Sequence, residues 1–227
     1  MTGGLDAYAP FVGSGTIEEL RLLGEQLRGR RVQNINSTAV GGGVAEILNR
    51  LIPLLREVGI DARWDVMRGG DEFFAVTKAI HNGLHGKPVS LGEHDVEIFR
   101  QTTEQNLRTL DLSDDIVFIH DPQPAGFIQR RAPGSRWIWR CHIDLSSPWP
   151  AVWDFVRAWV ERYDVAVFSA PSSRARCPSI RCSSRRRSTR SPTRTESSTR
   201  TRSSRWWRAS ASTRRAPWSR RSHASTG

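Results

Sequence analysis

The chain has 227 residues and a formal net charge of +11, a length that allows one large domain or two small ones. The charge is unequally divided: residues 1–171 hold 18 Lys and Arg against 22 Asp and Glu, whereas residues 172–227 hold 16 Arg and one acid. The basicity therefore belongs to the last 56 residues, and it does not indicate a nucleic-acid or membrane partner for the rest of the chain.

Cysteine content and hydropathy narrow the class of protein further. Three cysteines without framework spacing argue against a secreted disulfide scaffold and against a zinc site. No run approaches 18 apolar residues and no signal peptide opens the chain, so we expect a cytoplasmic protein with no membrane partner.

The order of expected elements predicts an α/β fold. Residues 1–30 form an N-terminal segment with one helix, about 17–27, where leucines recur at helical spacing. From residue 31 onward, strands and amphipathic or apolar helices alternate. We expect strands at 32–37, 60–67, 115–120, 136–143 and 164–169, and helices at 44–58, 71–84, 95–110 and 150–162. This alternation predicts a Rossmann-like, doubly wound, mostly parallel sheet over residues 31–171.

A glycine loop joins the first expected strand to the helix that follows it. Gly41, Gly42 and Gly43 allow a turn that no side chain obstructs. The first turn of a helix presents backbone N–H groups at the positive end of its dipole, a place that suits a phosphate or diphosphate. Three glycines are a weak signal on their own, so a tight turn without a ligand remains the alternative.

Polar side chains gather at the carboxyl ends of three expected strands, the edge at which such sheets bind ligands. They are Asn36 and Ser37 beside the glycine loop, His120 and Asp121, and Arg140, His142 and Asp144. A random scatter would not select the same end of three strands, although ordinary loop residues are the alternative.

A histidine pair stands on the expected helix 71–84 and its end. His81 and His85 are four residues apart, a spacing that could bind a metal ion. No third ligand is close in the sequence, so we expect no metal site and a solvated or core-edge role for the pair.

Three stretches carry a family resemblance: VQNINSTAVGGGVAE with the sequence that follows it, IVFIHDPQP, and WIWRCHIDLS. Together they resemble the N-terminal domain of glycosyltransferring trehalose synthases, over residues 5 to 171. These are retaining enzymes of the two-Rossmann-domain (GT-B) architecture. They join glucose from a nucleotide-diphosphate glucose to free glucose, and trehalose phosphorylases share the motifs.

The resemblance implies roles for the predicted site residues. Gly42 and Gly43 would approach the donor diphosphate, and Asn36 beside them would also bind substrate. His120 and Asp121 would line the sugar site as the catalytic candidates. Arg140, His142 and Asp144 would help to bind the acceptor glucose. No cofactor is implied beyond the nucleotide-sugar donor, and the expected partners are the sugar, the nucleotide sugar and the second Rossmann domain.

The sequence departs from the family after residue 171. Of residues 172–227, 53 belong to the types whose codons have G or C in the middle position; the exceptions are Ile180, Glu196 and His223. A one-base slip in a GC-rich gene would produce this composition, so we interpret the segment as translated out of frame. With almost no aliphatic residues, it is expected to be a disordered basic tail. The alternative is a functional Arg-rich segment that binds nucleic acid, with aromatic side chains stacking on bases.

Three functional hypotheses follow. The first is the acceptor-side domain of a trehalose-forming hexosyltransferase, inactive as an isolated fragment. The second is a sugar-binding or docking module with a genuine nucleic-acid-binding tail. The third is a fragment of a trehalose phosphorylase.

Overall fold

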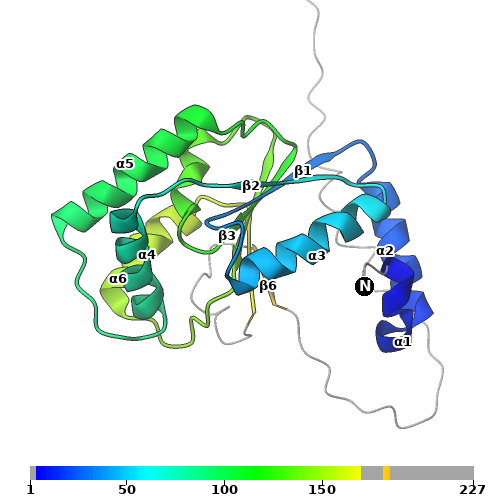
Figure 1. Cartoon of the computed structure of the whole chain (residues 1–227), viewed down its shortest axis with the longest axis horizontal. Coiled ribbons are helices and arrows are strands. Elements are labelled where there is room, and N and C mark those ends of the chain that lie inside the picture. Colours follow the sequence, from blue (N-terminus) through cyan, green and yellow to red (C-terminus); the bar gives the residue numbers. More distant parts are fainter. Residues whose placement is uncertain (1–3, 170–180, 185–227) are drawn as a thin grey trace, which may run out of the picture. The chain divides into compact units, whose positions relative to one another are not determined.

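The computed structural model describes residues 4–169 and 181–184 (Figure 1). Its centre is a sheet of six parallel strands in the order β2-β1-β3-β4-β5-β6. The strands are β1 (Arg31–Asn36), β2 (Asp61–Val66), β3 (Ile116–His120), β4 (Arg136–Cys141), β5 (Val165–Phe168) and β6 (Arg181–Ser184). From β1 the sheet extends in both directions, to β2 on one side and to β3, β4, β5 and β6 on the other. This all-parallel order confirms the predicted Rossmann-like fold.

Helices cover both faces of the sheet. They are α2 (Ser14–Gln26), α3 (Gly43–Glu57), α4 (Asp71–Leu84), α5 (Glu93–Thr109) and α6 (Pro150–Val160). Figure 1 shows α4, α5 and α6 together on one side of the sheet and α3 with α2 on the other. Two apolar cores fill these interfaces, a large one under α4, α5 and α6 and a smaller one under α3. Among the residues that the structure describes, no helix is long and apolar enough to span a bilayer.

Strand β1 shows how the sequence produces two cores. Successive side chains of a strand point to opposite faces. Val32 packs in the core under α3, and Ile35 packs in the core on the other face. Asn34 therefore shares the α3 face with Val32, whereas Gln33 points to the opposite face. Both amides are buried, at 2% and 0% exposure.

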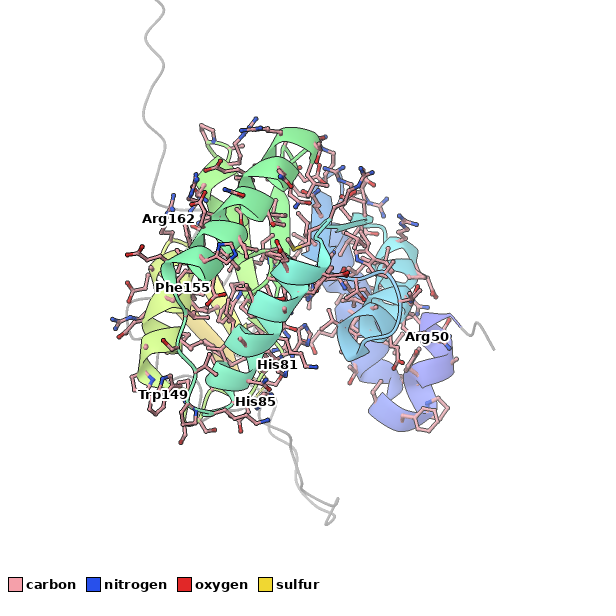
Figure 2. The ribbon with its side chains drawn as sticks, turned by 60° about the vertical axis from the view of Figure 1, so that its left-hand side comes forward. Arg50, His81, His85, Trp149, Phe155 and Arg162 are labelled. Carbon is pink, nitrogen blue, oxygen red and sulfur yellow. The ribbon has the colours of Figure 1, made fainter. Side chains whose placement is uncertain are left out.

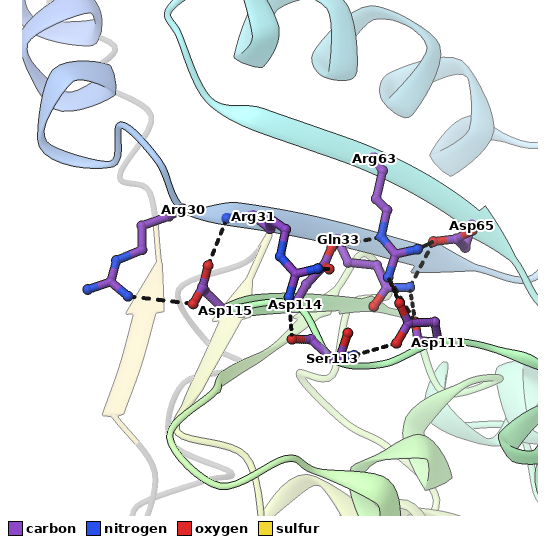
Figure 3. Close-up of polar contacts among 9 residues, drawn as sticks. All are labelled: Arg30, Arg31, Gln33, Arg63, Asp65, Asp111, Ser113, Asp114 and Asp115. Carbon is purple, nitrogen blue, oxygen red and sulfur yellow. Dashed lines mark hydrogen bonds and ion pairs between the residues drawn. The ribbon is translucent and has the colours of Figure 1, made fainter.

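The amino ends of the strands are held by an ion cluster, which Figure 3 shows. The Asp114 side chain is only 3% exposed, and its carboxylate lies 2.7 Å from Arg63 Nε. Arg31 Nη1 is 3.6 Å from the same carboxylate, and the Arg31 backbone N–H donates to Asp115 Oδ2 over 2.9 Å. The cluster ties β1 and β2 to the turn before β3, at the edge of the sheet opposite to the predicted site.

The N-terminal segment contains more structure than the single helix that we expected. A 3₁₀ turn, η1 (Leu5–Tyr8), and a short helix, α1 (Ala9–Val12), precede α2. Pro10 lies in the first turn of α1, where its missing N–H costs nothing. Gly13 then takes φ +85°, which separates α1 from α2. Leu5 is buried, and its N–H donates to the Glu57 carboxylate over 2.8 Å.

Strand β6 corrects the expectation of disorder at four residues of the segment 172–227. It pairs with β5 in parallel register, from Val165 with Arg181 to Phe168 with Ser184. Pairing at a sheet edge uses backbone N–H and C=O groups, so it does not require the aliphatic side chains whose scarcity predicted disorder. The rest of that segment, and with it the remainder of the prediction, lies outside the described residues.

Candidate functional site

A pocket of about 530 Å³ opens at the carboxyl ends of β1, β3 and β4. Seven of the eight predicted site residues line it: Asn36, Gly42, Gly43, His120, Asp121, Arg140 and His142. The predicted convergence of the strand ends is therefore observed. Another hollow, of about 600 Å³, is lined by 88–91, Val96, Ala151 and the Trp149 and Phe155 side chains seen in Figure 2. No ionisable side chain lines that hollow, so it offers no acid–base chemistry.

The glycine loop forms one wall of the pocket. Gly42 is the N-cap of α3 and Gly43 its first residue, so the first N–H groups of the helix have no intrahelical acceptor. A Cβ atom on Gly43 would meet nothing within 4 Å, so the space above the loop is open. Asn36 fixes this loop: its Nδ2 donates to Thr38 O and its Oδ1 accepts from Trp64 Nε1, both over 2.8 Å. Asn36 therefore shapes the wall through contacts within the chain.

Asp121 lines the pocket with a left-handed backbone conformation. Its φ of +65° is the single positive value among the non-glycine residues of 4–169 and 181–184. Three hydrogen bonds hold it there: its N–H donates to Arg140 O, its O accepts from Trp139 Nε1, and its Oδ1 accepts from His142 N over 2.7 Å. Strain of this kind is concentrated at functional sites. Burial raises the pKa of the Asp121 carboxyl to about 6, against the opposing effects of the His142 N–H and Arg140.

His120 and His142 form a hydrogen-bonded pair. His120 Nδ1 lies 3.0 Å from His142 Nε2, and His120 Nε2 lies 3.1 Å from Asn34 Oδ1. Burial lowers the pKa of His120 to about 3, with further lowering by His142 and Arg140. Burial and Arg140 lower the pKa of His142 to about 4. Both imidazoles are therefore neutral at pH 7, and each has one donor and one acceptor nitrogen.

Arg140 brings a positive charge to the pocket. Its Nη2 donates to Ser169 Oγ over 3.1 Å and its Nη1 to Val167 O over 3.3 Å. These bonds anchor the guanidinium to β5, the neighbouring strand. Its charge favours an anionic ligand in the pocket, since a guanidinium remains protonated at any physiological pH.

Asp144 is the predicted site residue that does not line the pocket. It is exposed, and its Oδ1 accepts hydrogen bonds from the N–H and the hydroxyl of Ser146. A role for Asp144 in binding the acceptor sugar stays a prediction.

His81 and His85 also line the pocket, whereas the sequence predicts a solvated or core-edge role for them. Figure 2 shows the two rings at one end of α4, and their centroids are 4.8 Å apart. Gly86, with φ +91°, follows them, and a Cβ there would lie 2.6 Å from Ser147 O. This close approach brings the end of α4 against the segment that follows β4. The i, i+4 spacing was the only sequence signal for the pair.

The pocket thus combines four histidines, a carboxyl group, a guanidinium and a helix N-terminus. Neutral imidazoles and amides can donate to and accept from hydroxyl groups, whereas Arg140 and the N–H groups of α3 favour an anion. No three His, Cys, Asp or Glu side chains of the described segments are grouped so as to hold a metal ion. The chemistry fits a polyhydroxylated ligand next to an anionic group.

The chain is similar to known trehalose enzymes. A family model described as trehalose synthase, N-terminal domain, matches residues 34–174. A trehalose synthase from Pyrococcus horikoshii is 46% identical over 169 residues, which cover 74% of this chain and 41% of that protein. One from Rubrobacter xylanophilus is 44% identical over 168 residues, covering 71% and 40%. A trehalose phosphorylase from Grifola frondosa is 27% identical over 187 residues, covering 72% and 26%.

The chain spans about two fifths of the length of these trehalose synthases. The matched residues contain the whole glycine loop and the six pocket residues at the strand ends: Asn36, Ser37, His120, Asp121, Arg140 and His142. Because the family model covers more than half of the chain, this protein belongs to the family of trehalose synthase N-terminal domains.

Proposed function

We propose that the pocket binds the acceptor glucose in a retaining glycosyl transfer that forms trehalose from a nucleotide-diphosphate glucose. The observation that carries the proposal is the pocket itself: its hydroxyl-binding imidazoles lie beside Arg140 and the N-terminus of α3, in a family of trehalose synthases. The donor sugar would place its diphosphate near Gly42 and Gly43.

The pocket residues suit the charges of this reaction. Breaking a sugar–phosphate bond develops positive charge on the sugar and leaves negative charge on the diphosphate. Preorganised N–H groups and a guanidinium stabilise the negative charge. The acceptor hydroxyl must lose a proton, and Asp121 is our candidate to orient it or to accept that proton, with His120 acting through its hydrogen bond to His142. At pH 7 the Asp121 carboxyl, with its pKa near 6, is mostly ionised and can act as an acceptor.

The first test is sugar binding to the 227-residue chain, followed through the histidine ring signals in NMR. We expect glucose to shift the signals of His120 and His142, and His142→Ala to weaken the binding. His94→Ala is the matched control, because His94 is exposed on α5 and does not line the pocket. Titrations that leave the signals of both pocket histidines unchanged would refute the proposal.

The second test is catalysis. We expect no trehalose from this chain alone when it is supplied with glucose and a nucleotide-diphosphate glucose, since a GT-B enzyme works in the cleft between two domains. Trehalose produced by the purified chain would contradict this expectation. Phosphate-dependent cleavage of trehalose is the corresponding assay for the phosphorylase alternative, which rests on the weaker similarity to trehalose phosphorylases, 27% and 28% identity.

A further inference from the structure

Asn34 is a buried amide that contacts the pocket only through another residue. It lies in the middle of β1, is 2% exposed, and does not line the pocket. Its Oδ1 is 3.1 Å from His120 Nε2. Its Nδ2 has no hydrogen-bond partner among the residues that the structure describes. Leaving a buried amide donor unpaired costs free energy. The contact between the Asn34 oxygen and His120 is therefore the interaction that would favour an amide at this position.

The contact with Asn34 determines which nitrogen of His120 carries the proton. An amide oxygen only accepts hydrogen bonds, so the His120 nitrogen facing it must be protonated. A neutral imidazole has one N–H, and His120 Nδ1 is therefore the bare nitrogen. It lies 3.0 Å from His142 Nε2, which must then be the donor. The two rings are inclined by only 22°, which lets an in-plane N–H point at an in-plane lone pair.

The same reasoning gives the state of the last nitrogen. With its proton on Nε2, His142 has an unprotonated Nδ1 that can only accept. This Nδ1 has no hydrogen-bond partner in residues 4–169 or 181–184, although His142 lines the pocket. The backbone N–H of His142 is already bound to Asp121 Oδ1, so it does not compete for the same ligand.

We propose that Asn34 is a positioning residue that fixes the tautomers of His120 and His142, so that His142 Nδ1 accepts a hydrogen bond from a hydroxyl of the bound sugar. This inference rests on the proposed function for its ligand, but the tautomers themselves do not. The relay Asn34–His120–His142 sets the direction in which a hydroxyl must point, and it selects hydroxyl donors over carbonyl and ether oxygens.

The test reads the tautomers directly. In the full chain labelled with ¹⁵N-histidine at neutral pH, we expect His120 and His142 to show protonated Nε2 and unprotonated Nδ1. Protonated Nδ1 on either ring would mean that the amide is turned around, and it would overturn the proposal. This measurement needs no variant and no sugar, so it stands apart from the test of sugar binding.

Two variants separate positioning from packing. Asn34→Leu keeps the approximate volume but removes the acceptor, so we expect the signals of both histidines to move toward a mixture of tautomers and glucose affinity to fall about tenfold. Gln33→Leu is the matched control: Gln33 is a buried β1 amide with its own unpaired atom, on the opposite face and without a histidine partner. We expect it to lower stability and leave the tautomers unchanged. Unchanged tautomers in Asn34→Leu would also overturn the proposal.

Discussion

The buried His120 makes a specific prediction about acid stability. Burial lowers its pKa from 6.5 to about 3 in the folded chain. Between these pH values, the unfolded chain binds a proton that the folded chain does not bind. The contribution of His120 to stability is therefore complete above pH 6.5 and is lost as the pH falls toward 3.

The magnitude follows from the interval of pH. One pH unit in this range corresponds to about 1.4 kcal/mol, so lowering the pH from 6.5 to 5 should cost about 2 kcal/mol through His120 alone. Asp121 acts in the opposite direction, because its raised pKa lets the folded chain bind the extra proton between pH 3.8 and 6. His120 is not among the groups that shift the pKa of Asp121. The Asp121 contribution is therefore the same in the wild type and in a variant at position 120, and it cancels in the difference between their unfolding free energies.

The assay is urea unfolding of the wild type and His120→Gln at pH 7, 6 and 5. Gln replaces the imidazole by a side chain that does not titrate. We expect the difference in unfolding free energy between the two proteins to change by about 2 kcal/mol from pH 7 to pH 5, with the wild type losing more. Parallel stability profiles would refute the reasoning, since they would show that His120 binds protons equally in both states. An NMR titration of the His120 ring would confirm the cause.

Three further predictions concern the rest of the chain. Arg63→Met should lower the unfolding free energy by about 2 kcal/mol because it leaves the buried Asp114 carboxylate short of a partner, whereas Arg21→Met, which breaks an exposed pair, should change it by less than about 1 kcal/mol; urea unfolding of both checks this. Gly86→Ala should lower the melting temperature more than Gly134→Ala, because both glycines have positive φ but only Gly86 faces a backbone oxygen at close range; equal losses would show that the contact is unimportant. Resequencing the gene beyond codon 171 should reveal another reading frame that encodes a second βαβ domain; stop codons in both other frames would contradict the out-of-frame interpretation.

Most of the fold could be predicted because its strands and helices have clear periodicity. The five predicted strands and the helices α2 to α6 all occur, with ends that differ from the prediction by a few residues. The convergence of polar residues was predictable as well, because parallel strands place their carboxyl ends at one edge of the sheet. His120, Asp121 and Arg140 needed no more than this rule.

The remaining features depend on contacts that periodicity does not encode. His81 reaches the pocket because the end of α4 packs closely on the segment after β4, a contact that requires Gly86. The role of Asn34 could not be predicted because this residue lies inside a strand rather than at its end, and its partner is 86 residues away. Asp144 follows β4 as the other site residues follow their strands, but it does not line the pocket, and its side chain accepts a hydrogen bond from Ser146.

The parallel arrangement of β1, β3 and β4 also affects how the domain folds. The relay joins residues 34, 120 and 142, so it connects one strand to partners that are 86 and 108 positions later in the chain. Pairing of parallel strands across such long separations is slow, because the chain pays the entropy of closing a long loop before it gains contacts. The ring signals of His120 can therefore report on refolding, since they acquire their native tautomer only after β1 and β3 have paired.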